Sequence, residues 1–140
     1  MIRLTEKTQQ DFLNKKWVER LQNAGVKMID NKYWLTEIDG TTYITEDKTI
    51  CEQMNYPVYP TYTLAELHYK LSEWHPEYKG LKLGGPIQWK DAPFYFALYE
   101  GAPDESPYSV YSEYPLYAAA QLLINCAKNG AEYVEDVSDK

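Results

Sequence analysis

The segment from Leu81 to Tyr99 constrains the fold most, because its apolar residues alternate as they do in two successive β-strands. Alternation over 87–90 is followed by an Asp-Ala-Pro turn at 91–93 and by renewed alternation over 94–99. A period of two residues is that of a strand with two distinct faces. The segment therefore predicts a β-hairpin, and 108–112 predicts a third strand. Gly84-Gly85, followed by Pro86, predicts a turn or a bulge where the first strand begins.

Three other segments show the period of an amphipathic helix. The first runs from Thr8 to Ala24 and ends at Gly25, which suits a left-handed C-terminal position. The second begins at the capping-box sequence Thr63-Leu64-Ala65-Glu66 and is expected to end at His75-Pro76. The third begins at Pro115 and ends at Asn129-Gly130.

The remaining segments complete an α+β pattern. Two stretches rich in β-branched and aromatic residues, 33–38 and 41–45, flank Asp39-Gly40, a pair that favours a type I′ hairpin turn. A helical turn or two is expected within 46–54, and the prolines of 55–62 favour extended or polyproline II backbone. We predict one α+β domain over 1–140, with a mostly antiparallel sheet of about three to five strands packed with three main helices. The acidic segment 131–140 is expected to be a frayed tail.

Charge and hydropathy exclude several classes of protein. The 140 residues carry a net charge of −7, with a pI near 4.8, which makes nucleic acid an unlikely partner. The first 27 residues are net +3, which leaves −10 for the rest. There is no apolar run long enough to span a bilayer and no secretory signal, so we expect a cytoplasmic protein without membrane contact.

Residues that carry chemistry are sparse, and we predict no enzyme, no metal and no cofactor. His68 and His75 lie seven residues apart, about two helical turns or roughly 10 Å, too far to share one ion. His68 is instead expected to be half-buried between Leu64 and Leu71. Cys126 falls within an apolar helical stripe and is expected in the core, while a bridge between Cys51 and Cys126 stays open.

The unusual feature of the composition is its 14 tyrosines, of which 11 fall between Tyr56 and Tyr117. Tyrosine offers a large contact area with a polar tip, which suits protein interfaces. We therefore predict a tyrosine-rich surface that binds a protein partner or a second copy of the chain. Its candidate residues follow a spacing of three: Tyr56, Tyr59, Tyr62, Tyr108, Tyr111 and Tyr114. The alternative is a nucleotide or sugar pocket beside the sheet, formed by Trp89, Tyr95 and Tyr99.

Three stretches carry a resemblance to a known group of proteins: NAGVKMIDNKYWLTEIDG, YPTYTLAELHYKL and PLYAAAQLLINCAKNG. Together they resemble small uncharacterised proteins encoded by phages and prophage-like elements of gut Bacteroidota, over roughly residues 23–130. The resemblance implies an accessory protein made in a bacterial cytoplasm, and it brings no catalytic residues. A phage product that inhibits a host factor would fit this context.

Overall fold

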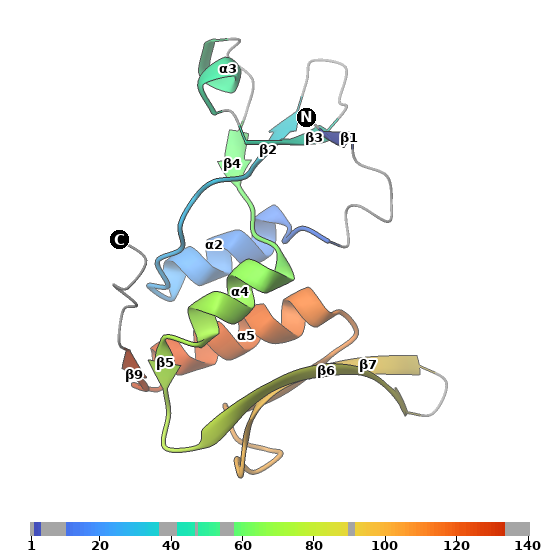
Figure 1. The fold of residues 1–140 in the computed structure, drawn as a ribbon, viewed down its shortest axis with the longest axis vertical. Helices are drawn as coiled ribbons and strands as arrows, with labels where there is room; N and C mark the ends of the chain where they lie inside the picture. The colour runs from blue at the N-terminus through green and yellow to red at the C-terminus, as the bar shows by residue number, and fades with distance from the viewer. Residues whose placement is uncertain are drawn as a thin grey trace.

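The chain is arranged as a layer of helices between two β-sheets (Figure 1). The computed structural model describes residues 2–3, 11–36, 42–46, 48–53, 58–89 and 92–133. The central layer holds α2 (Lys15–Asn23), α4 (Leu64–Leu71) and α5 (Pro115–Lys128). All strand pairs among the described residues are antiparallel. The predicted α+β class is therefore confirmed.

The sheet at the lower end of Figure 1, called here the lower sheet, contains the predicted hairpin. It consists of β6 (Lys79–Trp89), β7 (Ala92–Glu100) and β8 (Ser109–Ser112), in that order. The register shifts between the pairs Gly84–Phe96 and Ile87–Phe94, which confirms a bulge at the paired glycines. The bulge lies inside β6 and not at its start as predicted, because the strand already begins at Lys79. A Cβ on Gly84 would lie 2.6 Å from Phe96 Cζ, so the ring of Phe96 covers the glycine.

The sheet at the upper end, called here the upper sheet, has the strand order β1-β3-β2-β4 and is accompanied by α3. Its elements are β1 (Ile2–Arg3), β2 (Tyr33–Thr36), β3 (Thr42–Thr45), α3 (Lys48–Gln53) and β4 (Val58–Pro60). The hairpin of β2 and β3 confirms the prediction from the flanking strands, and the Asp39-Gly40 turn lies outside the described residues.

Two details of the upper sheet differ from the sequence prediction. A two-residue turn at Asp39-Gly40 would place Thr36 opposite Tyr43. Thr36 instead pairs with Thr42, so the register differs from the expected one by one residue. This register places Trp34 opposite Ile44, and both side chains are buried. Residues 58–60 pair with β2 as a strand, so of the two backbone forms expected there the extended one is found and the polyproline II alternative is not.

The first helix is shorter than its apolar stripe suggested. Residues 11–14 are not helical, and α2 begins after Asn14, whose side-chain oxygen accepts a hydrogen bond from the Trp17 backbone N–H at 3.1 Å. An asparagine that caps the first free N–H groups fixes the start of a helix. Residues 8–10 lie outside the described part of the chain. Gly25 has φ of 85°, which confirms the predicted left-handed position.

The second helix begins as predicted and ends early. The capping box is formed by Thr63 and Glu66, each side chain accepting from the other's backbone N–H. The helix α4 stops at Leu71, because the chain then turns into β5 (Trp74–His75), which pairs with β9 (Glu132–Tyr133). This pairing corrects both the predicted helix end at His75 and the prediction of a frayed tail for 132–133; residues 134–140 lie outside the description.

The core lies between α5 and its neighbours. Pro115 is at the first position of α5, as predicted, and the three successive alanines 118–120 are almost fully buried. Small side chains allow α4 and the strands β7 and β8 to approach the helix closely. Leu67 and Leu71 of α4 and Leu122 and Leu123 of α5 are completely buried.

Leu13, just before α2, links the upper sheet to the helical layer through its backbone carbonyl and its backbone N–H. The Leu13 oxygen accepts hydrogen bonds from Trp34 Nε1 at 2.8 Å and from Thr61 Oγ1 at 2.6 Å. The Leu13 N–H donates to the Tyr62 oxygen at 3.0 Å. Because all four residues are buried, this junction holds the two parts of the chain through desolvated hydrogen bonds.

Candidate functional site

In the first predicted tyrosine set, the two residues that the structure describes, Tyr59 and Tyr62, are half-buried and buried. Tyr62 is only 3% exposed, and its hydroxyl donates to Asp30 Oδ1 at 2.6 Å. Burial, and then this hydrogen bond, raise the pKa of Tyr62 well above its usual value. Tyr59 is half-buried beneath the ammonium of Lys15, 5.3 Å from the ring centroid, and Tyr56 lies outside the described residues. Tyr62 is therefore a core residue, and its assignment to an interaction surface is corrected.

The second set is divided among three environments. Tyr108 packs toward the core, with its ring 5.9 Å from that of Tyr78 and 6.3 Å from that of Tyr99. Tyr111 is 47% exposed on β8, and Tyr114 is 41% exposed at the start of α5. A spacing of three alternates faces along a strand, so Tyr108 and Tyr111 cannot share one side.

The lower sheet has large apolar residues on both of its faces. The inner face, which includes Ala97, Tyr99 and Val110, packs against the core. The opposite face, called here the outer face, contains five large apolar side chains that the strand register places on one side: Ile87, Phe94, Phe96, Leu98 and Tyr111. Ile87 and Tyr111 are nearly half exposed, and the other three keep partial exposure.

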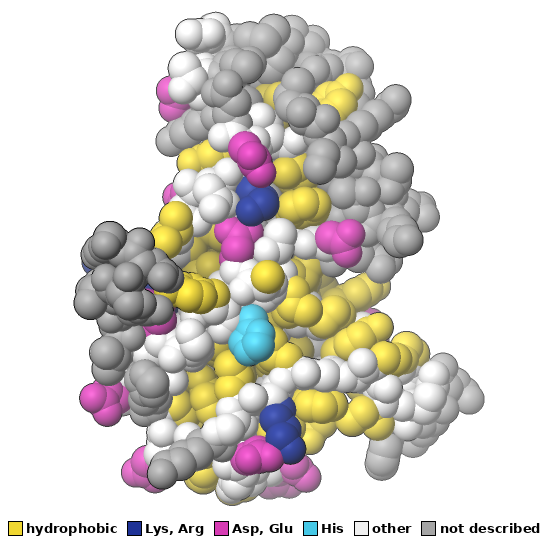
Figure 2. All heavy atoms as spheres, viewed as in Figure 1, with side chains coloured by type: hydrophobic (Ala, Val, Ile, Leu, Met, Phe, Trp, Pro, Cys, Tyr) yellow, Lys and Arg dark blue, Asp and Glu magenta, His cyan; other side chains and the backbone are white. Residues whose placement is uncertain are grey.

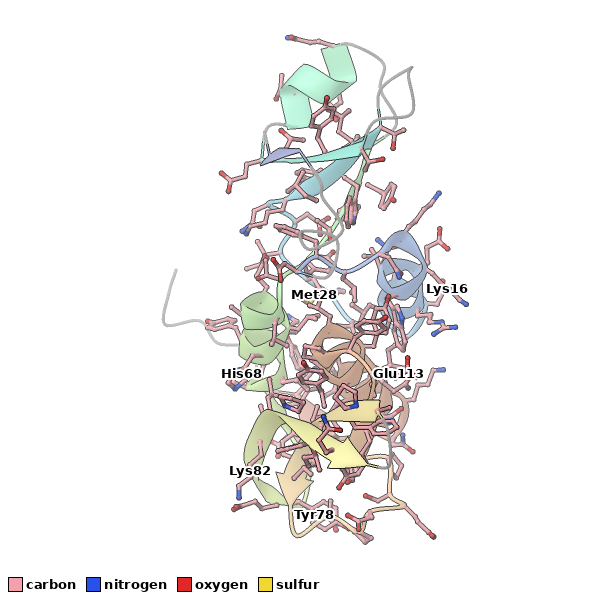
Figure 3. The ribbon with its side chains drawn as sticks, turned by 90° about the vertical axis from the view of Figure 1, so that its right-hand side faces the viewer. Lys16, Met28, His68, Tyr78, Lys82 and Glu113 are labelled. Atoms are coloured by element: carbon pink, nitrogen blue, oxygen red, sulfur yellow. The ribbon has the colours of Figure 1, made fainter. Side chains whose placement is uncertain are left out.

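A second aromatic group lies between α2 and α5. The rings of Trp17 and Tyr117 stack at 5.2 Å, and the rings of Tyr114 and Tyr117 meet edge to face at 5.1 Å. Arg20 covers the ring of Trp17 at 4.6 Å, while Asn14 Nδ2 donates to the Tyr117 hydroxyl at 2.9 Å. We call these residues the α2–α5 aromatic group. In Figure 3 the labelled Lys16 projects from α2, the helix that supplies Trp17 and Arg20.

Two clefts border the lower sheet. The first, about 600 Å³, lies between α4 and β6 and is lined by His68, Lys82 and several apolar side chains. His68 is exposed there, not half-buried as expected, because the buried face of α4 is centred on Leu67 and Leu71. In Figure 3 His68 and Lys82 project on the same side of the molecule, and Figure 2 shows hydrophobic side chains around the histidine.

The second cleft, about 380 Å³, lies where α4 ends and β6 begins, and we call it the Trp74 cleft. It is lined by Leu71, Ser72, Trp74, Pro76, Glu77, Tyr78, Gly80, Leu81 and Tyr99. Tyr99 thus lines a cleft, as the ligand hypothesis required. Tyr95 is four residues away along β7, roughly 13 Å, so the two rings do not converge on one site. The side chain of Trp89 lies outside the described residues.

The sequence missed the Trp74 cleft because its aromatic residues come from two distant parts of the chain. Trp74 in β5 and Tyr78, just before β6, lie four residues apart, whereas Tyr99 lies near the end of β7. The spacing of Trp74 from Leu71 predicts the apolar face of a longer helix, and no spacing rule relates Trp74 to Tyr99.

The described residues offer little for covalent or metal chemistry. Cys126 is fully buried, which confirms its expected place in the core, and it is a free thiol without a bridge to Cys51. Burial raises the pKa of Cys126 to about 11, which keeps it protonated at neutral pH. In the part of the chain that is described, no three His, Cys, Asp or Glu side chains gather where they could hold a metal ion.

The fold and these surfaces define an α+β protein with an apolar outer sheet face and an aromatic cleft. No helix within the described ranges has the length and apolar character needed to cross a membrane. Comparison with known protein families, with curated proteins and with solved structures found no match in any of the three.

Proposed function

We propose that this chain is a non-enzymatic accessory protein that binds a protein partner through the outer face of its lower sheet. The observation that carries the proposal is the apolar character of both faces of that sheet, although only one face packs against the core. An antiparallel sheet with a single buried face usually presents polar side chains to water. Contiguous apolar surface on a soluble protein is typical of interaction sites.

The residue types on this surface support a protein partner. Tyrosine and phenylalanine are enriched at interface centres, where they bury a large area at a small cost in side-chain entropy. Tyr111 lies directly opposite Phe96, so an exposed and a partly buried aromatic residue are cross-strand neighbours on this face. Lys82 and Glu100 form an ion pair at 2.5 Å on the same face, which supplies a polar rim.

The α2–α5 aromatic group is a second place where such a partner could extend its contact. Arginine, tryptophan and tyrosine are the residues that contribute most to binding energy in interfaces. Its rings, however, already contact one another and join two helices, so the outer face remains the primary surface of the proposal.

The biological context of the proposal comes from the sequence resemblance. The resemblance of the sequence to phage-encoded proteins suggests an accessory protein acting in a bacterial cytoplasm, with inhibition of a host factor as one role.

Substitution of exposed positions tests the outer face without disturbing the core. Ile87→Lys and Tyr111→Lys place charges where the side chains are 46% and 47% exposed. Tyr69→Lys is the matched control, because Tyr69 is 44% exposed but belongs to α4. Association is measured by analytical ultracentrifugation for a second copy, and by affinity capture from a host lysate for another protein.

We expect the wild type and Tyr69→Lys to bind the same partner, whether this is a second copy or another protein. Ile87→Lys and Tyr111→Lys should both lose that binding. All three variants should retain the circular dichroism of the wild type. A monomer that retrieves no protein, or a partner retained equally by all variants, would refute the role of the outer face.

A further inference from the structure

The Trp74 cleft has an unusual combination of aromatic and anionic surroundings. Three aromatic side chains line it, together with Pro76 and the exposed carboxylate of Glu77. Among the side chains that the structure describes, no lysine or arginine lines this cleft. Tyr78 lies near the lower end of the molecule, at the approach to β6 (Figure 3).

Three electrostatic features of this cleft favour a positive charge. The faces of tryptophan and tyrosine rings carry negative quadrupole density, which attracts cations. The cleft also borders the C-terminal end of α4, at Leu71 and Ser72, where the helix dipole is negative. The Glu77 carboxylate adds a full negative charge, and its field contributes to the raised pKa of nearby Tyr108, after the effect of burial.

Two of the aromatic side chains, Tyr99 and Trp74, are held in place by contacts with neighbouring residues. The Tyr99 hydroxyl donates to the Leu71 oxygen at 3.2 Å, which fixes the ring against the helix end. The Trp74 ring packs 4.8 Å from that of Tyr133. Tyr133 is in turn held by Lys70, whose ammonium donates to its hydroxyl at 2.7 Å. A site whose rings are already positioned loses little entropy when a ligand enters.

We propose that the Trp74 cleft binds a small organic cation of the quaternary alkylammonium type, with Trp74, Tyr78 and Tyr99 as its aromatic walls and Glu77 as its counter-ion. Aromatic cages are the usual way in which proteins recognise trimethylammonium groups. The inference departs from the nucleotide ligand of the sequence hypothesis, because Glu77 would repel a phosphate. It is independent of the outer face, so either proposal can fail alone.

Titration with choline, compared with 3,3-dimethyl-1-butanol, tests the charge of the ligand. The alcohol has the same shape but carries a neutral carbon in place of the ammonium nitrogen. Binding is followed by NMR through the indole N–H of Trp74, a buried donor for which no hydrogen-bond partner is found among the described residues. Trp74→Phe assigns that signal. We expect choline to bind with a dissociation constant on the order of 1 mM and the alcohol about tenfold more weakly.

Two variants separate the contributions of the ring and the carboxylate. Tyr78→Leu removes an aromatic wall while keeping apolar volume, and it should weaken choline binding about tenfold, whereas Tyr78→Phe should retain it. Glu77→Gln should weaken choline binding several-fold and leave the alcohol unaffected. Tyr111→Lys, which alters the outer face, serves as the control with unchanged choline affinity.

The source of the cation is distinguished by a second titration. Free choline and a peptide containing trimethyl-lysine present the same trimethylammonium group. Tighter binding of choline would identify a free small molecule as the ligand, and tighter binding of the peptide would identify a modified protein. Equal affinity for choline and the neutral alcohol would overturn the proposal, since the cleft would then be merely apolar. Absence of any shift of the Trp74 signal in the folded wild type would overturn it as well.

Discussion

Replacing Tyr62 with phenylalanine removes one buried hydroxyl and provides a strict test of how this protein responds to alkaline pH. The ring of Tyr62 is almost fully buried, so phenylalanine fills the same space. The change deletes the hydrogen bond to the Asp30 carboxylate at 2.6 Å. Asp30 is exposed and can bind water instead, so we expect a loss at neutral pH near the lower end of about 1.5–3 kcal/mol, the range for bonds to charged groups.

The pH dependence of that loss has a definite sign. The pKa of Tyr62 in the folded protein is raised, chiefly by burial, above its value of about 10 in the unfolded chain. Above pH 10 the unfolded chain therefore releases a proton that the folded protein keeps, and the free energy of unfolding falls as pH rises. At pH 11 the difference amounts to RT ln 11, or about 1.4 kcal/mol, for this single group.

The phenylalanine variant has no such proton to release. The difference in unfolding free energy between wild type and Tyr62→Phe should consequently shrink by about 1.4 kcal/mol between pH 7 and pH 11. Urea unfolding, followed by circular dichroism at pH 7 and at pH 11, measures this difference in unfolding free energy. Thr61→Val is the control, because it deletes a neighbouring buried hydrogen bond to Leu13 without a titrating group, so its difference should stay constant. If the difference in unfolding free energy between wild type and Tyr62→Phe stayed constant or grew with pH, the reasoning would be refuted.

Three further predictions concern the core and the helix contacts. Leu67→Ala, at a fully buried position of α4, should lower the free energy of unfolding by about 2–5 kcal/mol in urea denaturation, and a loss below about 1 kcal/mol would contradict its place in the core. In a Cys51→Ser variant, Cys126 should react with a thiol reagent at pH 8 only after urea unfolding, because burial protects it and raises its pKa to about 11; rapid labelling of the folded protein would disprove this. A double-mutant cycle with Trp17→Leu and Tyr117→Leu should give a coupling of about 0.5–1.5 kcal/mol from ring stacking, and additive effects would show that the contact contributes nothing.

The sequence was sufficient wherever the determining interactions are local. The start of α4 follows from Thr63 and Glu66, three residues apart, and the start of α5 follows from Pro115. The hairpin of β6 and β7 follows from alternation on each side of a short turn, and the Gly84 bulge follows from a residue that the Phe96 ring requires to be small. In each case the residues that specify the structure are close in the chain.

Features that depend on distant pairing could not be predicted. Trp74 was assigned to a helix by its spacing from Leu71, but its backbone pairs with Tyr133, 59 residues later. A similar long-range pairing with β2 made residues 58–60 a strand, where two prolines alone suggested only extended backbone. Tertiary pairing overrides local pattern in both segments, and the Trp74 cleft depends on the first of them.

The tyrosine content also takes on a different meaning once the side chains are placed. Tyr62 and Tyr99 are buried, and the hydroxyls of Tyr62, Tyr99 and Tyr117 donate or accept hydrogen bonds that join separate segments of the chain. Alanines fill the closest helix contacts of the core, which leaves room for tyrosine rings near the ends of helices and strands. There the tyrosine hydroxyl can reach a backbone or side-chain oxygen.

Among the described tyrosines, the four that are exposed by 40% or more lie on four different elements or their ends: Tyr69, Tyr111, Tyr114 and Tyr133. A surface made of tyrosines spaced three apart is therefore not what the fold provides. What it provides is one exposed tyrosine, Tyr111, on a sheet face whose other large apolar side chains are phenylalanine, leucine and isoleucine. If this protein binds a partner, the apolar neighbours of Tyr111 should contribute as much as its ring, and Ile87→Lys should be as damaging as Tyr111→Lys.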